Sequence, residues 1–328
     1  MRTLFILLLV SGCFTLWSQE KRALNRLDMK ESKEESSPDS LNNSYTMSLE
    51  PLCPSKGYNE CMGIELGKET DVIYFATNGK NINKFNLTSS VQAETIVTIK
   101  EVTRAWNDEY GDTFLHDMKL GKDGYIYAVA ENCVLKIDKE NESYETIIKG
   151  GFQGPWGGYG IALDEKGNIL VGDHYGGIHI FMENENWAKK TIIKSGKNKG
   201  DKKSFGGLKL DKNILYYLDF ENSLLVTATL KWKEGMPEVL NTKTLYLPLN
   251  YPEYLQIWNG DVFAKAAREN KMLRIRNNQI IQEIDFTSDS EVSPIVTFRL
   301  QIHNDNTATF YGTSWGPKGT LFRGKLNW

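Results

Sequence analysis

Short hydrophobic runs alternate with polar turns along most of the chain, and residues 159–181 are the clearest example. Their pattern predicts three strands, at 161–163, 169–171 and 178–181, because each apolar run is bounded by a turn rich in Gly, Asp and Asn. Gly167 can supply the positive φ that the first turn needs. Three short strands cannot bury their faces alone, so the pattern indicates a unit that packs against copies of itself.

The same pattern recurs at intervals of 43 to 53 residues, close to the spacing of propeller blades. Each copy has an apolar central strand, and these strands are centred on Ile73, Ile126, Ile169, Ile214, Val262 and Thr309. Outer strands are predicted at 95–99, 144–148, 190–193, 244–247 and 280–284. The sequence therefore predicts an all-β fold, a six-bladed β-propeller.

The last repeat contains three predicted strands, at 295–302, 308–313 and 320–326, and lacks a fourth. Residues 45–49 alternate as a strand does and precede the first repeat. We expect this N-terminal strand to close the last blade, because pairing there removes two exposed sheet edges.

The first 44 residues have a different character from the repeats. Residues 1–18 have the pattern of an export signal, with Arg2 before an apolar core at 4–10 that is too short to span a membrane. We therefore expect a secreted protein; the alternative is a bacterial lipobox at 10–13, which would place a lipid anchor on Cys13. Residues 19–44 are charged and Ser-rich, which predicts a disordered tether or pro-segment ahead of a propeller at 45–328.

Composition narrows the classes of partner. The chain is 40% hydrophobic with a formal net charge of −3, so it has no basic excess to bind nucleic acid. We expect it to be a monomer. Cys53 and Cys61 are predicted to form a disulfide, and Cys133 to be a buried, inert thiol. Sequons at Asn86 and Asn141 permit glycosylation.

The innermost strand of each blade lines the axis of a propeller, and ligands bind where these strands start. Two histidines are placed at this end, each beside an aspartate. We expect His116 to act as a general base oriented by Asp117 or Asp173, with His174 as its partner, because an imidazole titrates near neutral pH. The predicted ligand-binding side chains at the same mouth are Trp156, Tyr159, Phe205, Tyr254, Arg299 and Trp315. The competing interpretation is that the histidines bind neighbouring loops and the aromatic rings cap the channel.

Two segments, HDMKLGKDGYIYAVA at 116–130 and YGIALDEKGNILVGD at 159–173, are similar to repeat segments of the SMP-30/gluconolactonase and NHL-type six-bladed propellers. The resemblance extends over residues 62–328. In that family a divalent cation at the channel mouth, held by a Glu, two Asn and an Asp, polarises a lactone or ester. The matching positions here hold Met62, His116, Tyr159 and Gly206, so the resemblance implies the fold while the metal ligands are not kept.

These observations predict a secreted propeller enzyme that acts on a small apolar or aromatic molecule by hydrolysis or by cofactor-independent oxidation. For oxidation, a compact secreted chain of this size is similar to the luciferases of luminescent syllid worms. A non-catalytic propeller that binds a ligand or a protein is one alternative. A Ca²⁺- or Mg²⁺-dependent lactonase or esterase, with a site rebuilt from Glu60, Asp117 or Glu131, is the other.

Overall fold

The computed structural model describes residues 44–328 except 54–62, 70, 78–79, 91, 100–114, 154–156, 197–202, 268, 288–294 and 315–320. The described residues all belong to one compact unit, Asn43–Trp328. The expected export signal, Cys13 and nearly all of the expected tether therefore lie outside the described residues. No helix of the described part is long and apolar enough to cross a membrane.

The regular secondary structure of the described residues is β-strand, apart from one 3₁₀ turn, η2 (Glu183–Glu185). The first four-stranded sheet contains β2 (Ile64–Leu66), β3 (Val72–Thr77), β4 (Asn81–Asn86) and β5 (Glu94–Thr98). The second contains β6 (Leu115–Leu120), β7 (Ile126–Ala130), β8 (Cys133–Asp138) and β9 (Ser143–Lys149). The third contains β10 (Gly158–Leu163), β11 (Ile169–Asp173), β12 (Gly177–Met182) and β13 (Ala188–Lys194). The fourth contains β14 (Phe205–Asp211), β15 (Ile214–Asp219), β16 (Leu224–Lys233) and β17 (Met236–Tyr246).

The fifth sheet has eight strands, because the N-terminal strand β1 (Ser44–Pro51) joins two sets. One set contains β18 (Pro252–Trp258), β19 (Asp261–Ala266), β20 (Lys271–Arg276) and β21 (Gln279–Thr287). The other contains β22 (Ile295–Asn304), β23 (Thr307–Ser314) and β24 (Leu321–Asn327). Their order in the sheet is β18-β19-β20-β21-β1-β24-β23-β22.

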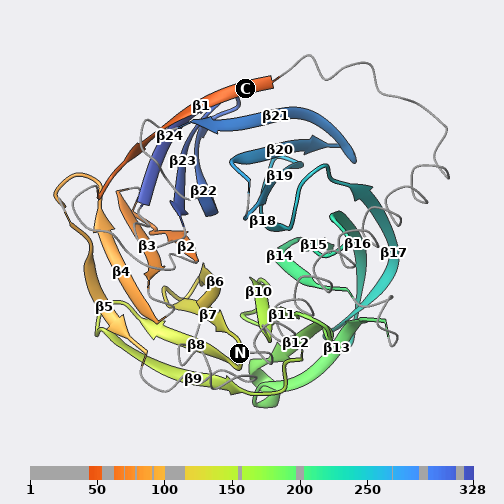
Figure 1. Cartoon of the computed structure of the whole chain (residues 1–328). Helices are drawn as coiled ribbons and strands as arrows, with labels where there is room; N and C mark the ends of the chain where they lie inside the picture. The colour runs from red at the N-terminus through yellow and green to blue at the C-terminus, as the bar shows by residue number, and fades with distance from the viewer. Residues whose placement is uncertain are drawn as a thin grey trace, which may run out of the picture. The chain divides into compact units, whose positions relative to one another are not determined.

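The first strands of the sheets form a closed circle (Figure 1). Along this circle β2 contacts β6, β6 contacts β10, β10 contacts β14, β14 contacts β18, β18 contacts β22, and β22 contacts β2 again. Each set of strands then runs outward from this circle, and the eight-stranded sheet runs outward from β18 and returns to the circle at β22. The all-β propeller arrangement expected from the sequence is therefore confirmed, while the structure contains five hydrogen-bonded sheets rather than six separate blades.

The predicted central strands coincide with the second strand of every set, β3, β7, β11, β15, β19 and β23. One outer strand differs, because the strand predicted at 244–247 belongs to the much longer hairpin of β16 and β17. Glu234 and Gly235, at φ 52° and 82°, form the turn of this hairpin. Leu230 and Trp232 alternate with exposed lysines, which extends strand β16 up to this turn.

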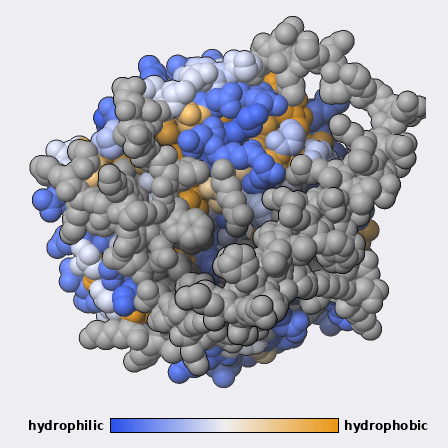
Figure 2. Space-filling view, viewed as in Figure 1, coloured by the Kyte–Doolittle hydropathy of each residue, from blue (hydrophilic) through white to orange (hydrophobic). Residues whose placement is uncertain are grey.

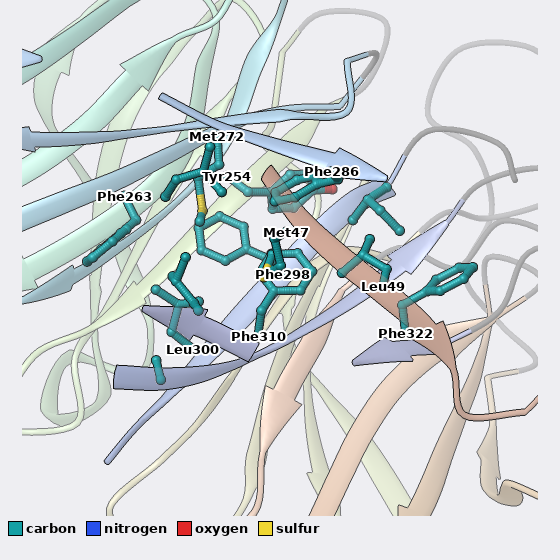
Figure 3. Packing of buried hydrophobic residues seen from close by; sticks show 14 of the residues in the cluster. Met47, Leu49, Tyr254, Phe263, Met272, Phe286, Phe298, Leu300, Phe310 and Phe322 are labelled. Atoms are coloured by element: carbon teal, nitrogen blue, oxygen red, sulfur yellow. The ribbon is translucent and has the colours of Figure 1, made fainter. Parts of the chain in front are cut away.

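The N-terminal strand pairs with the last strand, as expected, and also with a second neighbour. Leu49 lies opposite Gly324 in an antiparallel pairing with β24, while Tyr45 lies opposite Ile284 in a parallel pairing with β21. Met47 and Leu49 point into a buried cluster of Phe and Met side chains from β18 to β24 (Figure 3). One strand thus closes the ring and also ties together the two sets that flank it.

Hydrophobic side chains fill the space between neighbouring sheets. The first two sheets, for example, bury Tyr74 and Ile82 against Met118 and Leu135. Cys133 belongs to the same cluster, and burial raises the pKa of its thiol to about 12, which agrees with an inert cysteine. Cys53 is buried, but Cys61 lies outside the described residues, so the expected disulfide stays a prediction.

The described surface seen in Figure 2 is mainly hydrophilic, with apolar residues showing between the polar ones. Leu240 and Tyr246, both in the long strand β17, are the large hydrophobic side chains most exposed among the described residues. Single exposed apolar residues of this kind are ordinary for a folded protein.

Candidate functional site at the start of the inner strands

The inner strands share an irregularity close to their first residue. In β6, β10, β18 and β22 the pairing with the next strand shifts by one residue at this point, which is the signature of a β-bulge. The extra residues are His116, Tyr159, Glu253 and Val296. A bulge changes the direction of the side chain it carries, and bulges are common beside active sites. These four strands therefore each present one re-aimed side chain at the same end of the ring, whereas β2 pairs with β3 without a shift.

Three of these bulge residues meet. The ring of His116 stacks on that of Tyr159, with 4.5 Å between ring centroids and 26° between planes. The Tyr159 hydroxyl donates a hydrogen bond of 2.6 Å to Oε2 of Glu253. Because β6, β10 and β18 are separate strands of three different sheets, this contact draws one end of the channel together. All three side chains are at most 6% exposed.

The stack continues beyond Tyr159 into two loops that join second to third strands. Tyr159 contacts Phe220 at 5.0 Å, and Phe220 stacks on His174 at 5.5 Å with nearly parallel planes. His174 also stacks on Tyr175 at 4.0 Å. We call the series His116, Tyr159, Phe220 and His174 the aromatic ladder. It brings both predicted histidines into one cluster, with two aromatic rings connecting them.

Polar groups lie at both ends of the aromatic ladder. The hydroxyl of Tyr254 donates to the carbonyl oxygen of His116 at 3.1 Å, and burial raises the pKa of Tyr254 well above its usual value. At the other end, Nε2 of His174 lies 3.6 Å from Oε1 of Glu221. The two histidines therefore have different polar neighbours.

A buried ion cluster lies next to His116 along the axis. Asp117 accepts from Nη2 of Arg299 at 3.2 Å and from Nζ of Lys119 at 2.8 Å, and Oε1 of Glu65 lies 3.4 Å from Nε of Arg299. Burial by itself lowers the pKa of Arg299, but Glu65 and Asp117 outweigh it and the net change is upward. Burial and the nearby Arg299 lower the pKa of Lys119 to about 8. Asp117 and Arg299 thus hold inner strands β2, β6 and β22 together.

Asp173 supports the loop that carries His174. Its Oδ2 lies 2.9 Å from Nε2 of His179, whose Nδ1 lies 2.9 Å from the hydroxyl of Thr191. The same carboxylate accepts hydrogen bonds from the backbone N–H groups of Gly176 and Gly177. The Asp173 side chain is fully buried, so it fixes the loop from within the sheet.

The structure places the predicted site residues in three groups. His116, His174 and Tyr159 form the aromatic ladder, and Tyr254 binds the backbone of His116. Asp117, Asp173 and Arg299 take part in the ion cluster and the loop support just described, so their role in orienting a histidine stays a prediction. Phe205 packs against Tyr217 between the third and fourth sheets rather than in the ladder. Trp156 and Trp315 lie outside the described residues.

Sequence reasoning missed Glu253 and Phe220. In a regular strand, neighbouring side chains point to opposite faces, so Glu253 and Tyr254 would not both face the site. The bulge at Glu253 turns its side chain toward the site. Aligning the repeats at the bulge would have found it, because Glu253 is the counterpart of His116 and Tyr159. Phe220 follows Asp219 at the end of β15, where its side chain is 1% exposed.

The donor set does not fit Ca²⁺ or Mg²⁺ at the position that the family resemblance implies. Of the described counterparts of the family's ligands, His116 supplies an imidazole, the phenol of Tyr159 already bonds Glu253, and Gly206 has no side chain. These hard cations require several oxygen ligands. Among the described residues no group of three His, Cys, Asp or Glu side chains could hold a metal ion. Glu60 and Met62 lie outside the described part.

No family model and no curated protein matches the sequence. Several solved structures do resemble the fold, although at low identity. Regucalcin, a calcium-binding protein from Agrobacterium tumefaciens, matches with a TM-score of 0.62 and 9% identity over 87% of this chain and 95% of its own. A gluconolactonase from Xanthomonas campestris matches with a TM-score of 0.61 and 8% identity over 85% of this chain and 89% of its own. Virginiamycin B lyase from Staphylococcus aureus matches with a TM-score of 0.54 and 12% identity over 85% of this chain and 99% of its own. The chain thus has the propeller fold shared by SMP-30/gluconolactonase and NHL-type proteins.

Proposed function

We propose that this chain is a secreted, monomeric six-bladed propeller enzyme that hydrolyses small esters or lactones carrying an aromatic or apolar group. In this proposal the eight-stranded sheet counts as two blades, joined by β1. The reaction takes place at the aromatic ladder, where the inner strands start. Sequons Asn86 and Asn141 carry glycans in the secreted protein.

One observation carries the proposal: three bulge residues from three inner strands converge at one end of the channel. A packed core would be served equally well by apolar side chains, as Val296 shows at the equivalent position of β22. Instead the positions hold an imidazole, a phenol and a carboxylate. Buried polar groups of this kind cost stability unless they are paired, and they gather at catalytic sites.

The residues suggest a division of roles. His116 acts as the general base: it takes a proton from water, the water oxygen bonds to the carbonyl carbon, and the ester C–O bond breaks as that proton returns to the leaving oxygen. Tyr159 stacks on the His116 ring and is itself held by Glu253, so these two residues position the base. His174 lies two rings away from His116 and next to the Glu221 carboxylate, so it supports the far end of the ladder rather than contacting the reacting carbonyl.

The aromatic ladder also indicates the kind of substrate. The rings of Tyr159 and Phe220 surround the two histidines with aromatic carbon, which suits a substrate that carries an apolar or aromatic group. One of the structural neighbours is a gluconolactonase, and this likeness favours hydrolysis over oxidation at the level of the fold alone. No contact among the described residues favours a luciferase-like oxidation.

A direct test is to assay the purified secreted chain against a panel of 4-nitrophenyl esters, dihydrocoumarin and aliphatic lactones, each with and without EDTA. The proposal predicts hydrolysis of the aryl substrates, with weaker hydrolysis of the aliphatic ones. Turnover should be the same with EDTA, because the described donor set does not fit Ca²⁺ or Mg²⁺.

Two results would contradict the proposal. Loss of turnover with EDTA, restored by Ca²⁺ or Mg²⁺, would establish the metal-dependent lactonase instead. Saturable binding of the same aryl compounds without turnover of any of them would establish the non-catalytic binding propeller.

A further inference from the structure

A cavity lies at the opposite end of the inner strands from the aromatic ladder. Its volume is about 790 Å³, within the range of small-molecule sites. It is lined by the ends of β6, β10 and β14 and by the turns that follow them. Strand β6 illustrates the separation, because His116 is near its start while Lys119 and Leu120 at its end face the cavity. The proposed hydrolysis does not use this cavity.

Two side chains of opposite charge lie at the axial end of the cavity. Lys119 is 13% exposed and donates to both oxygens of Asp117, at 2.9 and 2.8 Å. Glu65 is 15% exposed, and its Oε1 accepts from the backbone of Leu66 at 3.0 Å. The same oxygen lies 3.4 Å from Arg299. Both groups are thus held in place by the buried ion cluster and border the cavity at the same time.

The rest of the lining combines aromatic and charged groups. Tyr127 and Trp232 provide ring surfaces, and Leu163 and Leu210 add aliphatic ones. The phenol of Tyr127 is fixed by a bond of 2.7 Å to Asp123. The charged lining residues are nearly balanced, with lysines Lys119, Lys122, Lys166, Lys209 and Lys212 and acids Glu65, Asp123, Asp164, Glu165, Glu183 and Asp211. A simple anion or cation would meet as many repelling as attracting charges.

We propose that this cavity binds a zwitterion of amino-acid or short-peptide size. Lys119 receives the carboxylate, Glu65 receives the ammonium group, and Trp232 and Tyr127 contact an apolar or aromatic side chain. Opposite charges that are already held in place suit a ligand with both charges, because little side-chain order is lost on binding. Charge-assisted hydrogen bonds at both ends fix its orientation.

The experiment is a set of thermal melts and calorimetric titrations of the full chain with L-phenylalanine and the dipeptide Gly-Phe as probes. Phenethylamine and 3-phenylpropanoate serve as analogues with one charge each. We expect at least one zwitterion to raise the Tm and to bind at least 10-fold more tightly than either analogue. Binding should weaken above pH 8, because Lys119, whose pKa is about 8, loses its proton there. A bound carboxylate favours the charged amine and therefore moves this loss to a somewhat higher pH.

Variants locate the binding. Lys119→Met and Glu65→Gln should each weaken the zwitterion at least 10-fold, and Trp232→Leu, which leaves the ion cluster intact, should weaken it as well. His116→Gln should leave this binding unchanged, because it lies at the other end of the strand, so the result is independent of the hydrolysis. The proposal is overturned if neither zwitterion shifts the Tm at millimolar concentration, if one analogue binds equally well, or if Trp232→Leu binds like wild type.

Discussion

Lys265 is an unusual residue because its long cationic side chain is completely buried among apolar groups. Its Nζ donates to the carbonyl oxygens of Ala266 and Glu269 at 2.5 and 2.9 Å, and it lies 5.5 Å from the centre of the Phe286 ring. Burial lowers the pKa of Lys265 to about 7. Near neutral pH the folded protein therefore holds this amine partly deprotonated, while the unfolded chain keeps it charged.

The pH dependence of stability follows from this difference. Because the pKa is lower in the folded state, Lys265 destabilises the fold most at and below pH 7, and the cost declines as the pH rises toward its normal value of 10.5. Lys265→Met should therefore raise the Tm relative to wild type at pH 7 and raise it by clearly less at pH 10. Thermal melts of both proteins at the two pH values measure the change.

Lys271→Met provides the control for this comparison. Lys271 lies in the same sheet but is paired with Glu283 at 2.9 Å, and that bond raises its pKa. Its substitution should not stabilise the protein at pH 7. A Lys265→Met advantage that is the same at both pH values would contradict a lowered pKa.

At the residue scale, the sequence predicted three of the four members of the aromatic ladder. His116 and His174 stand out because histidines are few, and the repeat alignment placed them and Tyr159 at the same end. The pairing partners could not be predicted. Asp173 is adjacent to His174 in sequence yet bonds His179, because neighbouring residues of an extended chain point in opposite directions.

At the element scale, β1 is the strand on which ring closure depends. It is the edge partner of both β21 and β24, and alternate residues of it, Met47 and Leu49, are buried between the two sets of strands (Figure 3). The pattern at 45–49 predicted the strand and the last blade as the one it closes. The parallel pairing with β21 was missed, because a local pattern contains no information about a second neighbour.

Met47→Ala should test the packing of this strand. Met47 is fully buried, so the substitution leaves a cavity in the cluster and should cost about 2–5 kcal/mol of unfolding free energy. Denaturant unfolding monitored by tryptophan fluorescence measures it. Ser48→Ala is the matched control, because Ser48 in the same strand is exposed and should change stability by less than about 0.5 kcal/mol. Equal losses for the two variants would show that β1 does not hold the ring through its buried face.

At the scale of the whole molecule, the propeller arrangement was predictable because its signal is repeated. The same spacing of apolar strands and Gly- or Asn-containing turns occurs in every repeat, so an error in one does not obscure the rest. The merging of two sets of strands through β1 and the length of the β16–β17 hairpin are features of single places in the chain. Nothing in the repeat could indicate them.

The arrangement of the inner strands around the ring explains why the aromatic ladder lies at one end of them and the charged cavity at the other. The inner strands start at the same end, so the bulges of β6, β10 and β18 bring their re-aimed side chains together there. At the far end the same strands finish at the charged cavity. Lys119 and Asp117 on β6 join the two regions through the buried ion cluster.

The central claim is that His116 is the base of a hydrolytic site, and the most direct measurement is the kcat of His116→Gln on the best aryl ester of the panel. Our account predicts a fall of about 10²–10⁴-fold while the Tm stays close to that of wild type. His303→Gln is the control, because His303 is exposed and bonds Thr309 near the other end of β22. A His116→Gln protein that folds and turns over as fast as His303→Gln would contradict the account.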